Sequence, residues 1–346
     1  MTVASPAADE RVARTALVPR LLARPELGAV IGAVLVFIFF ASVTESFATP
    51  SGIANFLDPA STLGIMAVAV ALLMIGGEFD LSAGVMTGTA GLITATLATE
   101  WGMNLWLAMA VSLAFALAVG FLNGLLVMRT GLPSFIVTLG TFLMLQGLNL
   151  GVTKLITGTV QVRGLASADG YESAGQLFAS TFAVFGTDVR VAVLWWIGIT
   201  AAATWLLLRT RPGNWIFAVG GAAPSARSVG VPVARTKIGL FMLVSAAAWL
   251  VGVITALRLT SVQANAGIGL EFEFIIAAVI GGCLLTGGYG SAIGAAIGAL
   301  IFGMTKQGIV YANWDSDWFK FFLGLMLLGA TLVNTVVRRR AMRSRE

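Results

Sequence analysis

Long apolar runs recur along the whole chain and constrain its fold more than any other feature. A helix needs about 20 residues to cross the roughly 30 Å hydrocarbon core of a bilayer, and about ten runs are long enough. The predicted spans are residues 26–45, 61–77, 81–99, 104–128, 132–155, 190–208, 238–259, 271–286, 290–310 and 318–337. These runs lack the period-two alternation of barrel strands. We therefore predict an all-α integral membrane protein with about ten transmembrane helices.

The composition agrees with a membrane protein and excludes several kinds of enzyme. Hydrophobic residues make up 58% of the 346 residues and charged residues 11%, whereas a soluble domain carries about 25% charged residues. There is no histidine and a single cysteine, Cys283, which excludes histidine catalysis, histidine metal sites and an intrachain disulfide. We expect no catalytic residue, no metal and no cofactor.

No energy source is recognisable in the chain. No glycine is followed by lysine, so the G-x-x-x-x-G-K-[ST] loop that binds nucleotide phosphates is missing. Ionisable residues within the predicted spans are also scarce, which disfavours a proton-driven cycle. The driving force is therefore a solute gradient, an ion bound by neutral oxygens, or a separate ATPase subunit.

The distribution of positive charge predicts the orientation. The chain carries 21 Lys and Arg against 16 Asp and Glu, a net charge of +5. Most of the Lys and Arg fall within residues 11–24, 209–237 and 338–345, and cytoplasmic loops are the ones enriched in these residues. Both termini are therefore predicted to be cytoplasmic. The excess of Lys and Arg therefore indicates the orientation of the chain in the membrane rather than binding of nucleic acid.

This topology divides the chain into three parts. Residues 1–25 are predicted to form an uncleaved cytoplasmic tail, 26–337 a single transmembrane domain surrounded by membrane lipid, and 338–346 a basic cytoplasmic tail. Two long connections interrupt the domain, 158–189 outside and 209–237 inside. Connections of this length are more often functional than idle.

Two glycine-rich turns indicate an internal repeat. IGGEFDLSAG (75–84) has a counterpart in IGGCLLTGGYG (280–290), and each precedes a Gly/Ala-rich helix. Parallel repeats of this kind are typical of transporters, although Gly-Gly pairs also recur by chance in a chain with 41 glycines. Asp80 or Ser82 is placed to cap the following helix, and Ser82 aligns with Thr286. The residues predicted to build the turns are Gly76, Gly77, Asp80, Ser82, Gly281, Gly282, Gly287 and Gly288.

The polar residues inside the predicted spans are mostly uncharged. A neutral solute such as a sugar needs hydrogen-bonding side chains but no counter-ion along its path. Helix-to-helix hydrogen bonding in the membrane would use the same residue types. The residues predicted for the substrate path are Asn123, Thr141, Gln146, Asn149 and Asn334, and Thr138 and Thr255 are of the same kind.

The inner connection contains a compact helical segment, APSARSVGV. Pro224 and Ser225 open it, and Ala226, Val229 and Gly230 are expected to present a small surface. Such a helix, flanked by arginines and parallel to the membrane, suits the docking of a cytoplasmic partner. A plain amphipathic connector fits the same pattern.

Four segments, spread from the second predicted helix to the ninth, carry a family resemblance. They are GGEFDLSAG (76–84), NGLLVMRTGLPSFIVTLGT (123–141), GNWIFAVGGAAPSARSVGVPVARTK (213–237) and IGGCLLTGGYGSAIGAAIGAL (280–300). With them the chain resembles the permease subunits of bacterial ABC importers for ribose and related simple sugars. The resemblance implies a type II-like importer permease with several spans in the bacterial inner membrane.

The resemblance also implies partners. Two permease copies would form the pore, a cytoplasmic ABC ATPase would bind beneath, and a periplasmic or lipid-anchored binding protein would deliver sugar near Asp315 and Asp317. The coupling helix seated in the ATPase would include Ala223, Pro224, Ser225, Ala226, Arg227, Val229 and Gly230. The family usually has Asn-Pro-Glu ahead of Ala-Ala here, whereas this chain has Ala222, Ala223 and Ser225 in that stretch.

Two other functions remain open from the sequence. The Gly-Gly turn with Asp-Leu-Ser also occurs in permeases for branched-chain amino acids or nucleosides, which need the same partners. An autonomous secondary carrier would need neither an ATPase nor a binding protein.

Overall fold

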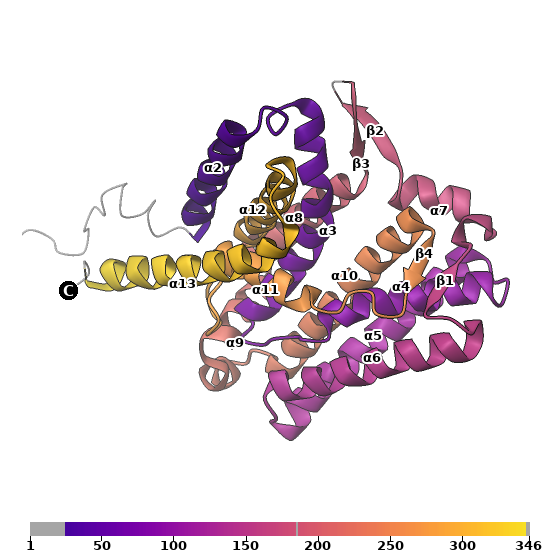
Figure 1. Cartoon of the computed structure of the whole chain (residues 1–346). Helices are drawn as coiled ribbons and strands as arrows, with labels where there is room; N and C mark the ends of the chain where they lie inside the picture. The colour runs from indigo at the N-terminus through magenta and orange to yellow at the C-terminus, as the bar shows by residue number, and fades with distance from the viewer. Residues whose placement is uncertain (1–24, 185, 344–346) are drawn as a thin grey trace, which may run out of the picture.

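The computed structural model describes residues 25–184 and 186–343, which are mostly helical (Figure 1). The helices are α2 (Pro25–Val43), α3 (Pro50–Ile75), α4 (Ala83–Thr99), α5 (Leu105–Thr130), α6 (Ser134–Thr157), α7 (Tyr171–Phe178), α8 (Ala192–Arg209), α9 (Arg211–Ser228), α10 (Val233–Leu259), α11 (Leu270–Ile280), α12 (Ala292–Tyr311) and α13 (Phe319–Arg343). Short 3-10 helices lie at Leu165–Ser167 and Ser316–Trp318, and the strands are β1 (Gln161–Arg163), β2 (Thr181–Val184), β3 (Thr187–Arg190) and β4 (Ser261–Gln263).

Seven of the described helices are long and apolar enough to cross a membrane, which confirms the helical membrane class. They are α2, α3, α5, α6, α8, α10 and α12. Two shorter apolar helices, α4 and residues 319–332 of α13, correspond to further predicted spans. Of the predicted tails, 1–24 and 344–346 lie outside the described residues, whereas 338–343 continue α13.

The eighth predicted span, 271–286, does not form one continuous helix. Helix α11 has only 11 residues, which at about 1.5 Å per residue is too short to cross the hydrocarbon core. The Gly281–Gly282 pair ends the helix, and the apolar residues that follow it form an irregular turn. Hydropathy alone extends the span because these turn residues are as apolar as the helix.

Helix α3 is the central element of the bundle. Of its most apolar stretch, 78% is buried, and every residue from Leu63 to Ile75 is buried. Helices α8, α10, α11 and α12 all pack against it. A helix that is apolar all round is stable only where protein or lipid surrounds it. Here other helices of the same chain supply that environment.

Glycines let neighbouring helices approach closely. A Cβ on Gly252 of α10 would overlap the carbonyl oxygen of Thr87 on α4, and one on Gly298 of α12 would overlap the carbonyl oxygen of Ala277 on α11. Small residues at such crossings allow backbone-to-backbone packing, the main attraction between helices in lipid. The glycine-rich faces of α4 and α12 therefore fix the packing of both helices.

The outer connection, 158–189, is folded rather than a simple loop. It contains β1, α7 and a β2–β3 hairpin that projects at the top of Figure 1. Strand β1 pairs antiparallel with β4, which comes almost 100 residues later in the chain. Strands of three or four residues are too short to show periodicity in a sequence. The sequence predicted helices only, and this is corrected: the described residues also form two small two-stranded sheets.

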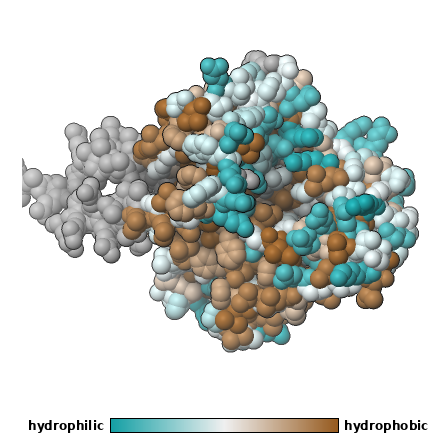
Figure 2. All heavy atoms as spheres, in the orientation of Figure 1, coloured by the Kyte–Doolittle hydropathy of each residue, from teal (hydrophilic) through white to brown (hydrophobic). Residues whose placement is uncertain are grey.

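The surface of the bundle is largely apolar. Hydrophobic residues, brown in Figure 2, cover the lower part of the face shown, and hydrophilic residues gather towards its centre and right. Large side chains such as Leu155, Trp205 and Leu208 are more than half exposed. A soluble monomer rarely exposes so much apolar area. Lipid is the solvent that this surface needs.

The close packing of α4 and α10 gives a stability prediction. Gly252→Ala should lower the melting temperature in detergent, because the added methyl group forces the two helices apart. Thermal unfolding followed by gel filtration measures this. Gly140→Ala on α6 is the control, since nothing lies within 4 Å of its Cβ position. Equal melting temperatures for the two variants would contradict the packing argument.

Candidate functional site

The two Gly-Gly turns share one backbone conformation. Gly76 and Gly281 cap their helices in the right-handed region with φ of −69° and −67°. Gly77 and Gly282 follow in the left-handed region with φ of +83° and +93°. The N–H groups bond back in the same pattern, Gly77 to Met74 and Glu78 to Leu73 in one turn, Gly282 to Val279 and Cys283 to Ala278 in the other. This is a Schellman-type helix end, and its recurrence agrees with the predicted repeat.

The two copies differ after the turn. Helix α4 begins after Ser82, but α12 begins after Ser291 rather than after Thr286. The sequence match of Ser82 with Thr286 therefore does not align two helix starts, and α12 begins close to the start of the predicted span 290–310. The second turn is longer, and Gly287 and Gly288, with φ of +79° and +72°, lie in the added length. Ser291 caps α12 by accepting a hydrogen bond from the N–H of Gly294.

Both turns meet α9 through glycine backbones. The N–H of Gly288 donates to the carbonyl of Ile75 at 2.8 Å. A Cβ on Gly220 of α9 would overlap this same Ile75 oxygen, and one on Gly287 would lie 2.8 Å from the Cα of Gly77. We name Gly77, Gly220, Gly287 and Gly288 the glycine junction. It joins the ends of both repeat copies to the helix of the inner connection.

Helix α9 breaks directly beside the glycine junction. Ala222 has φ −157° and ψ +87°, so residues 211–221 and 223–228 are two helical pieces. The second piece, together with Val229 and Gly230 after it, is the predicted coupling segment. Of its residues, Val229 is 79% exposed and Pro224, Ser225, Arg227 and Gly230 are also exposed, while Ala223 is half-buried.

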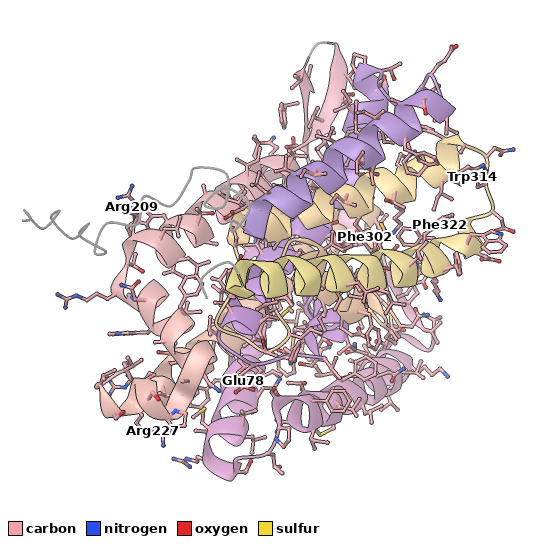
Figure 3. All side chains as sticks on the ribbon, turned by 90° about the vertical axis from the view of Figure 1, so that its left-hand side faces the viewer. Glu78, Arg209, Arg227, Phe302, Trp314 and Phe322 are labelled. Atoms are coloured by element: carbon pink, nitrogen blue, oxygen red, sulfur yellow. The ribbon has the colours of Figure 1, made fainter. Side chains whose placement is uncertain are left out.

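Ala226 does not belong to the exposed surface of this segment. It is 4% exposed and packs with Val219 and Val233 in a small hydrophobic cluster. The methyl group therefore joins the second piece of α9 to the start of α10. Figure 3 places Arg209 and Arg227 on one side of the molecule and Trp314 and Phe322 on the other.

An ion pair links the first turn to α10. The ammonium group of Lys237 donates to Glu78 Oε1, and both side chains are mostly buried. Figure 3 shows Glu78 close to α9. Removing one partner would leave a buried charge without compensation, which is more costly than removing both.

A chain of hydrogen bonds fixes the first turn to α5 and α6. The Oδ1 atom of Asp80 accepts from the Ser82 N–H at 2.8 Å and from the Ser82 hydroxyl at 2.5 Å. Asn123 on α5 donates to the Ser82 hydroxyl oxygen and accepts from Thr141 on α6 at 2.6 Å. All four side chains are buried. Ser82 is the N-cap residue of α4 but its side chain makes no capping bond; Asp80 accepts from Ser82 instead and orders the turn ahead of the helix.

Most predicted path residues lie in contacts between helices. Asn123 and Thr141 belong to the chain of hydrogen bonds above, and Asn149 on α6 donates to Thr89 on α4 at 3.0 Å. Gln146 on α6 is half-buried. Asn334 lies on α13, but its side chain is outside the described residues. Interhelical hydrogen bonds of this kind stabilise membrane bundles.

A cavity of about 390 Å³ with several polar groups in its lining lies elsewhere, towards the predicted outer ends of α3, α10, α11 and α12. Helices α3, α4, α10, α11 and α12 line it, and β1 and β4 lie at its edge. We name it the outer cavity. Its uncharged polar lining is Thr62, Thr87, Gln161, Thr255, Ser261 and Gln263, and its charged lining is Arg258, Glu273 and Lys306.

Only Thr255 of this lining follows from the polar residues of the predicted spans. Thr87 lies inside the predicted span 81–99 but was not among the predicted path residues, and the other polar residues lie in predicted connections or near the ends of predicted spans. Pairing of β1 with β4 brings Gln161 opposite Gln263, a contact that no local pattern indicates. Among the described residues, no group of three or more His, Cys, Asp or Glu gathers that could hold a metal ion.

The helical membrane fold, the glycine turns and the inner helix define a transport permease. Residues 52–331 match the family model described as branched-chain amino acid transport system / permease component. The match covers well over half of the chain, so the chain belongs to this family.

The similar proteins are permeases of transport systems. The chain is 32% identical over 307 residues to the ribose import permease RbsC of Escherichia coli K12, covering 87% of this chain and 91% of RbsC. It is 30% identical over 301 residues to the inner membrane ABC transporter permease YjfF of the same organism, covering 85% and 86%. The autoinducer 2 import permease LsrC of Salmonella typhi is 28% identical over 315 residues, covering 90% and 86%. No solved structure matches the chain.

The glycine junction gives a prediction about the inner helix. Gly220→Ala should loosen α9, because the added methyl group overlaps the Ile75 carbonyl. Trypsin should then cleave after Arg227 several times faster in detergent, as cleavage requires local unfolding. Gly221→Ala is the matched control, since its Cβ position has nothing within 4 Å. Equal cleavage rates in both variants would show that the junction does not hold α9.

Proposed function

We propose that this chain is the membrane-spanning permease subunit of an ATP-driven ABC importer for a simple sugar of the ribose, xylose or galactose kind. It resides in the bacterial inner membrane and crosses it several times. The observation that carries the proposal is the similarity to RbsC over 91% of the length of that permease. The scarcity of unpaired charge inside the bundle fits a neutral solute.

ATP hydrolysis is assigned to a cytoplasmic ATPase that docks on residues 223–230. Support comes from the exposure of Pro224, Ser225 and Val229, and from the position of this segment one residue beyond the break at Ala222. A movement of the docked segment would be transmitted to Gly220 of the glycine junction, which lies only a few residues earlier in the chain. Ala226 serves internal packing and is left out of the docking surface.

Two further partners complete the proposed importer. A sugar-binding protein docks on the outer side, near Asp315 and Asp317, and hands the sugar to the permease. A second copy of the chain completes the pore. Helix α13 extends beyond the body of the bundle (Figure 1), and Phe321, Leu325 and Leu328 on it are exposed, so this helix needs an apolar neighbour such as the second copy or lipid.

Reconstitution tests the proposal as a whole. Proteoliposomes that contain the permease, its ATPase and its binding protein should accumulate labelled sugar when ATP is supplied inside, and an ionophore should not abolish uptake. Permease alone should not accumulate sugar. Ionophore-sensitive accumulation by the permease alone would support a secondary carrier. Competition by leucine or a nucleoside, but not by any sugar, would support the other substrates.

The docking surface gives a separate prediction. Val229→Asp should abolish sugar uptake and the co-purification of the ATPase, because a charge replaces an exposed apolar side chain of the segment. Amounts of protein in the membrane should not change. Val160→Asp, the same change at an exposed position of the outer connection, is the control. Normal co-purification of the ATPase with Val229→Asp would rule out this segment as the docking surface.

A further inference from the structure

The outer cavity lies where the two repeat copies meet. Helices α3 and α4 of the first copy form one part of its wall, and α11 and α12 of the second copy form another. Binding sites of transporters commonly occur at such repeat interfaces. Its volume of about 390 Å³ falls within the range of about 300 to 1,000 Å³ that is usual for small-molecule pockets.

Some uncharged side chains that line the outer cavity have no strong hydrogen-bond partner among the described residues. Among the described residues, the Thr255 hydroxyl and the Gln263 amide make no side-chain hydrogen bond, although both residues line the cavity and are exposed in it. The Thr62 hydroxyl has only a long 3.4 Å contact, to the Pro59 carbonyl. A hydroxyl donates and accepts, and an amide carries both donors and acceptors. These groups match a ligand that is rich in hydroxyl groups.

One charged residue of the outer cavity, Arg258, is already paired. Its Nη1 atom lies 2.6 Å from Asp58 Oδ1. Glu273 and Lys306 also line the cavity, and the Lys306 ammonium group lies 5.8 Å from the ring centroid of Phe319. The carboxylate of an amino acid ligand would have to compete with Asp58 for Arg258, whereas a neutral ligand would leave this pair intact.

Apolar surface completes the outer cavity. Phe274 and Phe302 are almost fully buried and form part of its lining, and Figure 3 shows Phe302 in the middle of the bundle. Apolar walls with a few directed polar groups are typical of small-molecule sites. The C–H faces of a sugar ring fit such a wall, while its hydroxyl groups reach Thr62, Thr255 and Gln263.

We propose that the outer cavity is a monosaccharide site within the single permease chain, with Thr255 and Gln263 as its main hydrogen-bonding residues and Thr62 as a third. The proposal rests on the proposed sugar import and goes beyond it. Sugar delivered from outside is held by the permease itself before it moves inward. The site is separate from the hydrogen bonds of Asn123, Thr141 and Asn149.

Direct binding tests this site without any partner subunit. The full-length chain in lipid nanodiscs is mixed in turn with D-ribose, D-xylose, D-galactose and D-glucose, and with L-leucine as the amino acid probe. Saturation-transfer NMR detects weak binding of each probe. At least one sugar should receive saturation from the protein and leucine should not. Binding of leucine alone, or of no sugar, would overturn the proposal.

Isosteric variants assign the residues. Thr255→Val and Gln263→Met remove the polar groups at nearly constant volume, and each should weaken sugar binding about five- to tenfold, the effect of one lost hydrogen bond. Thr255→Ser keeps the hydroxyl and should bind like the wild type, which separates a lost contact from a damaged fold. Thr204→Val on α8, outside the cavity, is the control. Unchanged binding in both Thr255→Val and Gln263→Met would overturn the assignment.

Uptake by the complete importer separates the two proposals. If sugar uptake depends on ATP but sugar binding is the same in wild type, in Thr255→Val and in Gln263→Met, the import function stands and the cavity proposal fails. If the complete importer takes up no sugar at all, the import function itself fails. Reduced uptake in Thr255→Val at subsaturating sugar, with recovery in Thr255→Ser, supports both proposals.

Discussion

Close contact between backbones at the glycine junction is the constraint on which the inner half of this permease depends. The carbonyl of Ile75 ends the central helix and accepts a hydrogen bond from Gly288 of the other repeat copy. Gly220 of α9 lies so close that any side chain would disturb this contact. A buried carbonyl within lipid has no water to bond with. The three segments therefore hold one another in place at the inner end of the bundle.

Features set by local chemistry could be predicted from the sequence. Apolar runs identified the seven helices that are long enough to cross a membrane, and the paired glycines located both helix ends with their left-handed residues. The predicted span 290–310 likewise begins within two residues of Ala292, the first residue of α12.

The roles of polar residues inside the bundle could not be predicted from the sequence alone. Asn123 and Asn149 suit a solute path and a contact between helices equally well by residue type. The structure gives each a partner on another helix. The polar groups without such partners, at Thr255 and Gln263, come from a helix end and a short strand. Only the pairing of β1 with β4 brings the strand to the cavity, and a pairing between distant segments leaves no local pattern in the sequence.

The position of the outer cavity between the repeat copies has a thermodynamic consequence. Its walls belong to elements of both copies, so any sliding of one copy against the other changes the shape of the cavity. A ligand that fits one arrangement better than another must shift the balance between them by its difference in binding free energy. By linkage, a force that shifts the arrangement from the cytoplasmic side must alter the affinity for that ligand by the same factor. Ligand binding in the outer cavity and docking of a partner on the cytoplasmic side would then depend on the same conformational equilibrium.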